Sequence, residues 1–193
     1  MLRSSVWGRF AALVLCCVCA PASSAQTTVE AAWQQLRSGS ALLLLRHTDA
    51  PGLGDPANFT PGDCSTQRNL SPLGREQAAR WGRLLQQHGI TPLRILSSNW
   101  CRAIDTGKGM QAGKVETLQA LDSFFTERDN ANRQTQALIA QINALERSQR
   151  LVLISHQVNI TALSGIYPAS GEGLILALPL TQPPTVLARI AAP

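Results

Sequence analysis

The sequence predicts an α/β fold with a parallel sheet at its centre. Three segments of strand length, at residues 41–45, 94–97 and 151–154, each end abruptly in polar residues. Helices are expected at residues 29–36, 72–88, 131–145 and 158–163, and closing strands at 171–178 and 186–190. A further strand is expected at 115–118. Ligands of open α/β sheets bind beyond the carboxyl ends of the strands, so polar residues there are the first candidates for function.

Length and composition indicate one globular domain. The chain has 193 residues, of which 45% are hydrophobic and 15% charged, enough to bury a substantial core. The formal charge of +5 is mild. Lysine occurs only at Lys108 and Lys114, and no basic run is present, so a nucleic-acid partner is not expected. The oligomeric state cannot be predicted from this sequence.

Residues 1–25 have the pattern of a signal peptide. Arg3 and Arg9 precede an apolar stretch at 10–20, and small residues at 23–25 precede a cleavage site near Gln26. The apolar stretch is shorter than the roughly 20 residues that a spanning helix needs, which disfavours the alternative of a retained membrane anchor. We therefore expect one domain at 26–193, periplasmic or secreted, with no stable membrane anchor after cleavage. Its formal charge would fall to +3.

The strand ends carry residues suited to phosphate chemistry. Arg46 and His47 follow the first strand, Arg102 follows the second, and His156 follows the third. Since the carboxyl ends of parallel strands lie at one sheet edge, the four side chains can converge. A guanidinium holds phosphate oxygens while an imidazole supplies a nucleophile. A helix expected from Asn99 would add its N-terminal amides to the anion site. The simpler alternative is that these side chains only solubilise strand ends.

Four motifs occur in the order found in a known family. They are Arg46-His47-Thr48, the helix start from Leu70 to Ala78, the Ser-x-x-x-Arg element from Ser98 to Arg102, and Ser155-His156-Gln157. In these motifs the chain resembles the histidine phosphatase superfamily, in its phosphoglycerate-mutase-like branch with a small cap. The stretches DCSTQRNLS and HQVNITALSG are similar to exported members grouped with lipopolysaccharide-core heptose phosphate phosphatases. The resemblance implies a three-layer α/β/α sandwich with a mostly parallel central sheet.

The resemblance also implies a two-step phosphatase mechanism. His47 would attack phosphorus and form a phosphohistidine, while Arg46, Arg102 and a protonated His156 neutralise the phosphate oxygens. The glutamate that acts as general acid in the family aligns near Ser123, so the candidate acids here are Asp122 and Glu127. The function expected is an exported, metal-independent phosphomonoesterase without a cofactor. Its substrate would be a small-molecule phosphate ester, either an envelope phosphate or a sugar phosphate.

Further residues have two interpretations each. Arg68, Asn69, Gln157 and Asn159 are possible substrate contacts, or they serve turns and local hydrogen bonds; for Asn159 the local role is favoured. Cys64 and Cys101 are the cysteines left after cleavage. They form either a disulfide that ties the loop at 48–70 to the phosphate site or two separate apolar fillers. His88 is expected to be structural.

Two other classes of function stay open. The chain would be a catalytically silent binding module for phosphorylated glycans if its departure from the acid pattern abolishes turnover. A metal site made of His47, His156 and Asp49 is disfavoured, because Arg46 and Arg102 would repel a cation and no tight ligand spacing is present.

Overall fold

The computed structural model describes Met1, residues 24–146 and residues 148–193. The predicted signal peptide lies outside the described residues, except for Met1 and its last two residues, with which helix α1 (Ser24–Ser38) begins. Within the described part of the chain, every helix is too short or too polar to span a bilayer.

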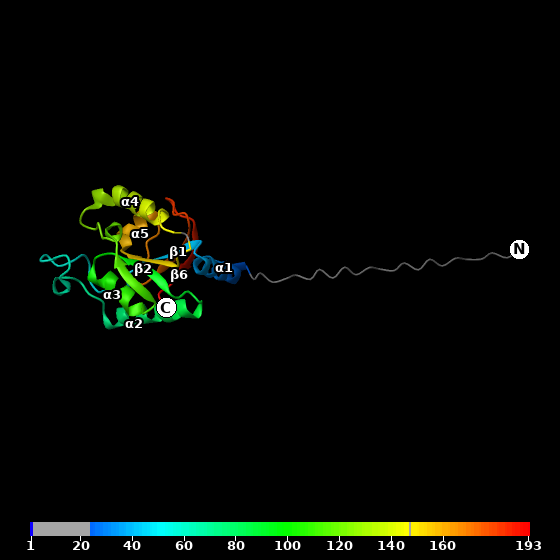
Figure 1. The fold of residues 1–193 in the computed structure, drawn as a ribbon, viewed down its shortest axis with the longest axis horizontal. Coiled ribbons are helices and arrows are strands. Elements are labelled where there is room, and N and C mark those ends of the chain that lie inside the picture. Colours follow the sequence, from blue (N-terminus) through cyan, green and yellow to red (C-terminus); the bar gives the residue numbers. More distant parts are fainter. Residues whose placement is uncertain (2–23, 147) are drawn as a thin grey trace.

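A six-stranded sheet in the order β3-β2-β4-β1-β5-β6 forms the centre of the fold (Figure 1). The strands are β1 (Ala41–Arg46), β2 (Leu93–Ser97), β3 (Gly113–Thr117), β4 (Leu151–Ser155), β5 (Gly173–Ala177) and β6 (Val186–Ile190). β1 to β4 run parallel, and β5 pairs antiparallel with both β1 and β6. The expected sheet, mostly parallel, is confirmed.

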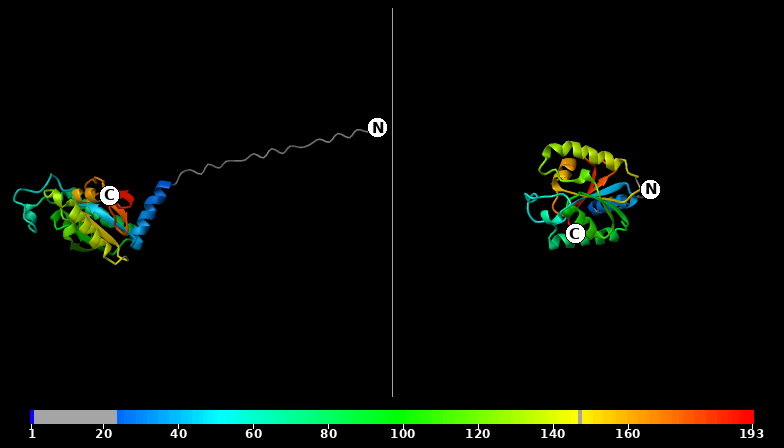
Figure 2. Two further views of the ribbon diagram at one scale, coloured as in Figure 1. Left: turned by 90° about the horizontal axis from the view of Figure 1, so that it is seen from above. Right: turned by 60° about the vertical axis from the view of Figure 1, so that its left-hand side comes forward.

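Helices cover both faces of this sheet, because the central strands are apolar on both sides. In β1, Leu43 and Leu45 pack in the core cluster that contains side chains of α1, α2 (Pro72–Gln87) and α3 (Cys101–Met110). Leu42 and Leu44 point the other way, toward α4 (Ala131–Asn143) and α5 (Gln157–Ser164). All four leucines are at most 1% exposed, as expected for a parallel strand buried on both faces. Figure 2 shows the resulting three layers.

Local chemistry sets the limits of α2. The Ser71 hydroxyl caps it by accepting a hydrogen bond from the Gly74 amide at 2.9 Å, and Pro72 occupies its first turn. Gly89, with φ +66°, follows its last turn. A Cβ on Gly82 would lie 1.9 Å from the carbonyl oxygen of Met110, so α2 and α3 pack with their backbones in close approach.

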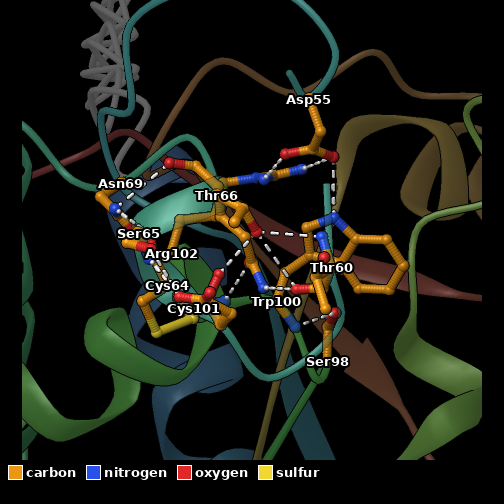
Figure 3. Close-up of a disulfide and its surroundings, with 12 residues drawn as sticks. Asp55, Thr60, Cys64, Ser65, Thr66, Asn69, Ser98, Trp100, Cys101 and Arg102 are labelled. Atoms are coloured by element: carbon orange, nitrogen blue, oxygen red, sulfur yellow. Dashed lines mark hydrogen bonds and ion pairs between the residues drawn. A yellow bond between two sulfur atoms is a disulfide. The ribbon is translucent and has the colours of Figure 1, made fainter. Parts of the chain in front are cut away.

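Short 3-10 turns shape the loops at the carboxyl edge of the sheet. They are η1 (Cys64–Thr66), η2 (Gln119–Leu121) and η3 (Arg128–Asn130). The loop between β1 and α2 is tied to the first turn of α3 by a disulfide between Cys64 and Cys101, whose Cα atoms are 5.7 Å apart (Figure 3). Helix α3 begins at Cys101, two residues later than expected, because residues 99 and 100 form a bend after β2.

Candidate active site

Two histidines that are far apart in the sequence meet beyond β1 and β4. These strands are neighbours, and Arg46 is paired with Ser155 at their carboxyl ends, so the next residue of each strand emerges at the same place. The rings of His47 and His156 have centroids 5.4 Å apart in an edge-on arrangement. The residues are only 2% and 3% exposed, respectively. The expected convergence of the two imidazoles is found.

Hydrogen bonding and burial leave the His47 ring neutral, with one nitrogen free. Its Nδ1 lies 2.8 Å from the carbonyl oxygen of Thr48. Because a carbonyl only accepts, Nδ1 carries the proton and Nε2 keeps a free lone pair in the neutral ring. Burial, together with the positive charge of Arg102, lowers the pKa of His47 to about 3. The ring is therefore neutral near pH 7.

His156 lies in a strongly buried and cationic environment. Its Nε2 lies 2.8 Å from the hydroxyl of Ser98, which can donate or accept. Burial first, and then interactions with His47 and Arg102, lower the pKa of His156 well below its usual value. The protonated His156 expected from the sequence concerns the protein with bound phosphate and stays a prediction. A bound anion would oppose the downward shift, because a nearby negative charge favours the imidazolium.

Three arginines reach the same cavity. Arg46 donates from Nη1 to the carbonyl oxygen of Pro168 at 2.9 Å, and Arg68 donates from Nε to that of Gly54 at 2.8 Å. The Nε atoms of Arg46 and Arg102 are buried without a hydrogen-bond partner among the described residues. An unsatisfied buried donor is costly. An oxyanion in the cavity would supply the acceptors that these two groups lack.

These side chains belong to one open cavity with an empty volume of about 480 Å³, here called the histidine cavity. Its wall combines cationic, polar and apolar groups: Arg46, His47, Gly52, Leu53, Gly54, Asp55, Arg68, Arg102, Ser123, Phe125, His156, Gln157, Val158 and Tyr167. Three guanidiniums face a single carboxylate, and the histidines are neutral, so the wall carries an excess of two positive charges. Such a wall attracts anions.

Asp55 is the carboxylate that sequence analysis missed. Its Oδ1 and Oδ2 lie 2.6 and 3.3 Å from Nη1 and Nη2 of Arg102, and Oδ2 also accepts from Trp100 Nε1 at 2.8 Å (Figure 3). The only signal was its place in the long loop after β1, since loops of that length are usually functional. Nothing local separated Asp55 from Asp49 and Asp63 in the same loop.

The two acids expected from the sequence do not line the cavity. Both carboxylate oxygens of Asp122 accept hydrogen bonds from Asn99, at 2.7 to 3.1 Å. Glu127 is exposed and accepts from Asn130 at 2.5 Å. Ser123, which lies between these two residues in the sequence, does line the cavity. The geometry therefore gives no support to Asp122 or Glu127 as the acid, because the chain turns both carboxylates toward asparagines.

The expected substrate contacts divide into two pairs. Arg68 and Gln157 line the histidine cavity. Asn69 instead donates to the carbonyl oxygen of Cys64 at 2.7 Å, and Asn159 donates to that of Asp122 at 2.7 Å. The structure thus places Asn69 and Asn159 in the local roles that were their alternatives.

The amides before and at the start of α3 are also engaged within the protein, contrary to expectation. Those of Asn99, Trp100 and Cys101 donate to Asp122 Oδ1, Ser98 Oγ and Gln67 Oε1. This region contributes the side chain of Arg102 to the cavity, while these three amides are already satisfied.

The metal alternative gains no support from the geometry. Asp49 accepts a hydrogen bond from the Ser71 hydroxyl and does not line the histidine cavity. Among residues 24–146 and 148–193, no three histidine, cysteine or carboxylate side chains are grouped as metal ligands.

Comparison with known proteins finds relatives in structure only. No protein-family model matches the chain, and no curated protein matches it. The structure is similar to that of the protein histidine phosphatase SixA complexed with tungstate, with a TM-score of 0.55 and 18% identity over 79% of this chain and 97% of that one. A phosphoserine phosphatase from Entamoeba histolytica in complex with 3-phosphoglyceric acid has a TM-score of 0.55 and 14% identity, covering 78% of this chain and 96% of its own.

The product of an open reading frame of Mycobacterium tuberculosis is also similar. Its TM-score is 0.55 and its identity 18%, over 79% of this chain and 97% of that one. At these identities the similarity establishes a shared fold, and the argument for activity depends on the side chains of this chain.

Proposed function

We propose that this chain is a phosphomonoesterase that works through a phosphohistidine on His47. The observation that carries the proposal is the meeting of His47 and His156, 5.4 Å apart, with three guanidiniums in one cavity. The structural neighbours described as phosphatases share this fold, and one of them was solved with tungstate, a tetrahedral oxyanion.

The residues suit a two-step displacement. The lone pair on His47 Nε2 forms a bond to phosphorus as the bond from phosphorus to the leaving oxygen breaks, and that oxygen takes up a proton. Water then attacks phosphorus, the bond to Nε2 breaks, and inorganic phosphate is released. Arg46 and Arg102 neutralise the phosphate oxygens throughout, and His156 adds its charge once the bound anion favours its imidazolium form. These cationic groups supply the charge for which a metal would otherwise be needed.

A direct test is phosphate release from p-nitrophenyl phosphate in the presence of a chelator. His47→Ala should reduce turnover on the order of 10³-fold or more, because the nucleophile is lost. His88→Ala is the matched control, since His88 stacks on Trp33 with ring centroids 4.2 Å apart and does not line the cavity. Undiminished turnover in His47→Ala would refute the proposal, and loss of wild-type activity on chelation would refute metal independence.

A catalytically silent module that binds phosphorylated glycans is the second candidate. It is favoured by one observation, namely that neither Asp122 nor Glu127 lines the cavity. Wild-type protein that binds sugar phosphates tightly but releases no phosphate from sugar, lipid-linked or protein substrates would establish this alternative.

We also propose that the protein is exported and acts on a small envelope or sugar phosphate. The charged and apolar pattern of residues 1–25 supports export. The disulfide supports it independently, because disulfides persist mainly in oxidising compartments. N-terminal sequencing of protein from the periplasmic or culture fraction should give a start near Gln26. A phosphate-release screen over heptose phosphates, other sugar phosphates and lipid-linked phosphates would identify the ester.

A further inference from the structure

The ion pair between Asp55 and Arg102 places a carboxylate where the proposed function requires a phosphate. Each carboxylate oxygen of Asp55 faces one terminal nitrogen of Arg102, at 2.6 and 3.3 Å. A guanidinium presents this same fork to a phosphate. The Arg102 side chain is only 3% exposed, so it has little room for two complete anionic partners. A substrate phosphate can engage the Nε of Arg102, which lacks a partner among the described residues, and a two-point hold on the guanidinium would also take a terminal nitrogen from Asp55.

Burial distinguishes Asp55 from the histidines with which it shares the cavity. His47 and His156 are 2% and 3% exposed, whereas the Asp55 side chain is 18% exposed. Asp55 belongs to the loop whose residues Gly52 to Asp55 line the cavity wall. In an in-line displacement the leaving oxygen departs on the side opposite the nucleophile. If His47 attacks from the buried side, the leaving oxygen departs toward the more exposed part of the wall, which includes Asp55.

Asp55 is also the one carboxylate among the cavity residues that the structure describes. Proton transfer to an alkoxide leaving group needs a donor within hydrogen-bond reach, and the other carboxylates near this edge are engaged elsewhere. Trp100 holds Asp55 Oδ2 at 2.8 Å independently of Arg102, so the carboxyl group keeps an anchor when the guanidinium turns to the substrate.

We propose that Asp55 gives up its ion pair with Arg102 when the substrate phosphate binds that arginine, and that the Asp55 carboxyl then donates a proton to the leaving oxygen. This inference rests on the proposed phosphatase function. As the substrate takes Arg102, the Asp55 carboxylate takes up a proton from solvent, and in the first step this proton passes to the leaving oxygen as its bond to phosphorus breaks. In the second step the resulting carboxylate takes a proton from the attacking water. The carboxyl group is thereby restored, and phosphate leaves.

The exchange also explains how a carboxylate held by an arginine becomes a proton donor. In the free protein burial raises the pKa of Asp55, but the hydrogen bonds from Arg102 and Trp100 outweigh burial and hold it below its usual value. When a phosphate takes Arg102, Asp55 loses a cationic partner and gains an anionic neighbour. Both changes favour the protonated form.

The test compares two leaving groups in Asp55→Asn. The comparison uses kcat/KM, which reports only the first step, because hydrolysis of the phosphohistidine is common to both substrates. Loss of an acid should reduce kcat/KM by about 100-fold or more on an alkyl phosphate such as glycerol phosphate. The loss in kcat/KM should stay within about 10-fold on p-nitrophenyl phosphate, whose phenolate leaves without protonation. Asp55→Glu should restore part of the activity on the alkyl ester. Asp105→Asn, an exposed change on the helix that carries Arg102, is the matched control and should leave both rates unchanged.

Equal losses of kcat/KM on both substrates would overturn the inference, because they would indicate a positioning or folding role for Asp55. An unchanged kcat/KM on the alkyl ester would overturn it too. If Asp55→Asn does not fold, the wild type decides: an acid predicts similar kcat/KM for alkyl and aryl esters, and a steep dependence of kcat/KM on the leaving group refutes it. Absence of wild-type turnover on both esters, by contrast, would refute the proposed phosphatase function itself.

Discussion

Removing the disulfide is expected to destabilise the fold by several kilocalories per mole. Cys64 and Cys101 are separated by 37 residues, and the bridge closes this segment into a loop. For a loop of this length, the chain-entropy relation gives about 4 kcal/mol of stabilisation through the unfolded state. Domains of this kind are stable by only about 5–15 kcal/mol. Cys64→Ala together with Cys101→Ala should therefore remove a large share of the total stability.

The bridge should matter to the cavity as well as to the unfolded chain. It holds the loop that carries Asp55 and Arg68 against the first turn of α3, where Gln67 accepts a hydrogen bond from the Cys101 amide at 3.0 Å. When the bridge is broken, this loop keeps only non-covalent contacts with α3. We expect a raised KM for phosphate esters, because the wall of the cavity is less well ordered.

Urea unfolding of three samples measures the effect: oxidised wild type, wild type with dithiothreitol, and the double variant. Reduced wild type and the double variant should both lose about 4 kcal/mol relative to oxidised wild type. Titration of free thiols under denaturant confirms the redox state of each sample. A loss below about 1 kcal/mol in both samples, with unchanged m-values, would refute the loop-closure reasoning.

Two further expectations concern pH and helix packing. Unfolded histidine binds a proton below about pH 6.5, whereas folded His47 does so only below about 3, so the unfolded state holds more protons in that window. The free energy of unfolding should fall as pH decreases from about 6.5 to 3, by up to about 1.4 kcal/mol per pH unit for this histidine. Urea unfolding at pH 7 and pH 5 should show a smaller decrease in His47→Ala than in wild type; equal decreases would contradict this assignment. Gly82→Ala should destabilise by about 3 kcal/mol or more, because its Cβ would lie 1.9 Å from the Met110 carbonyl oxygen. Gly165→Ala, which has φ +73° but open space around the new Cβ, should cost only about 1 kcal/mol, so equal thermal shifts in the two variants would contradict the packing argument.

The fold was predictable because its signals are local. The run from Ala41 to Leu45 is apolar at every position, which only a strand buried on both faces accommodates. Ser71-Pro72 and Gly89 determine the ends of α2 through capping and backbone chemistry that depends on a few adjacent residues. The boundary of α3 was less well predicted, since the bend before it depends on hydrogen bonds to Asp122 and Ser98.

The cavity was predictable to the extent that strand ends define it. Arg46 ends β1, His47 and His156 directly follow β1 and β4, and Arg102 lies in the first turn of the helix after β2, so sheet topology brings the four residues to one edge. The acid could not be placed in this way. Asp122 lies close to the cavity in sequence, but Asn99 binds its carboxylate, whereas Asp55 reaches Arg102 from 47 residues away.

The sequence by itself determined the layered α/β architecture, the two histidines and two of the arginines at the carboxyl edge of the sheet, because apolar periodicity and strand ends are properties of short segments. Only the tertiary structure decided which carboxylate faces the cavity, which histidine nitrogen stays free and how far burial shifts the histidine pKa values. Those features depend on partners contributed by distant loops and on how far the assembled fold excludes water, and neither is encoded within a short stretch of chain.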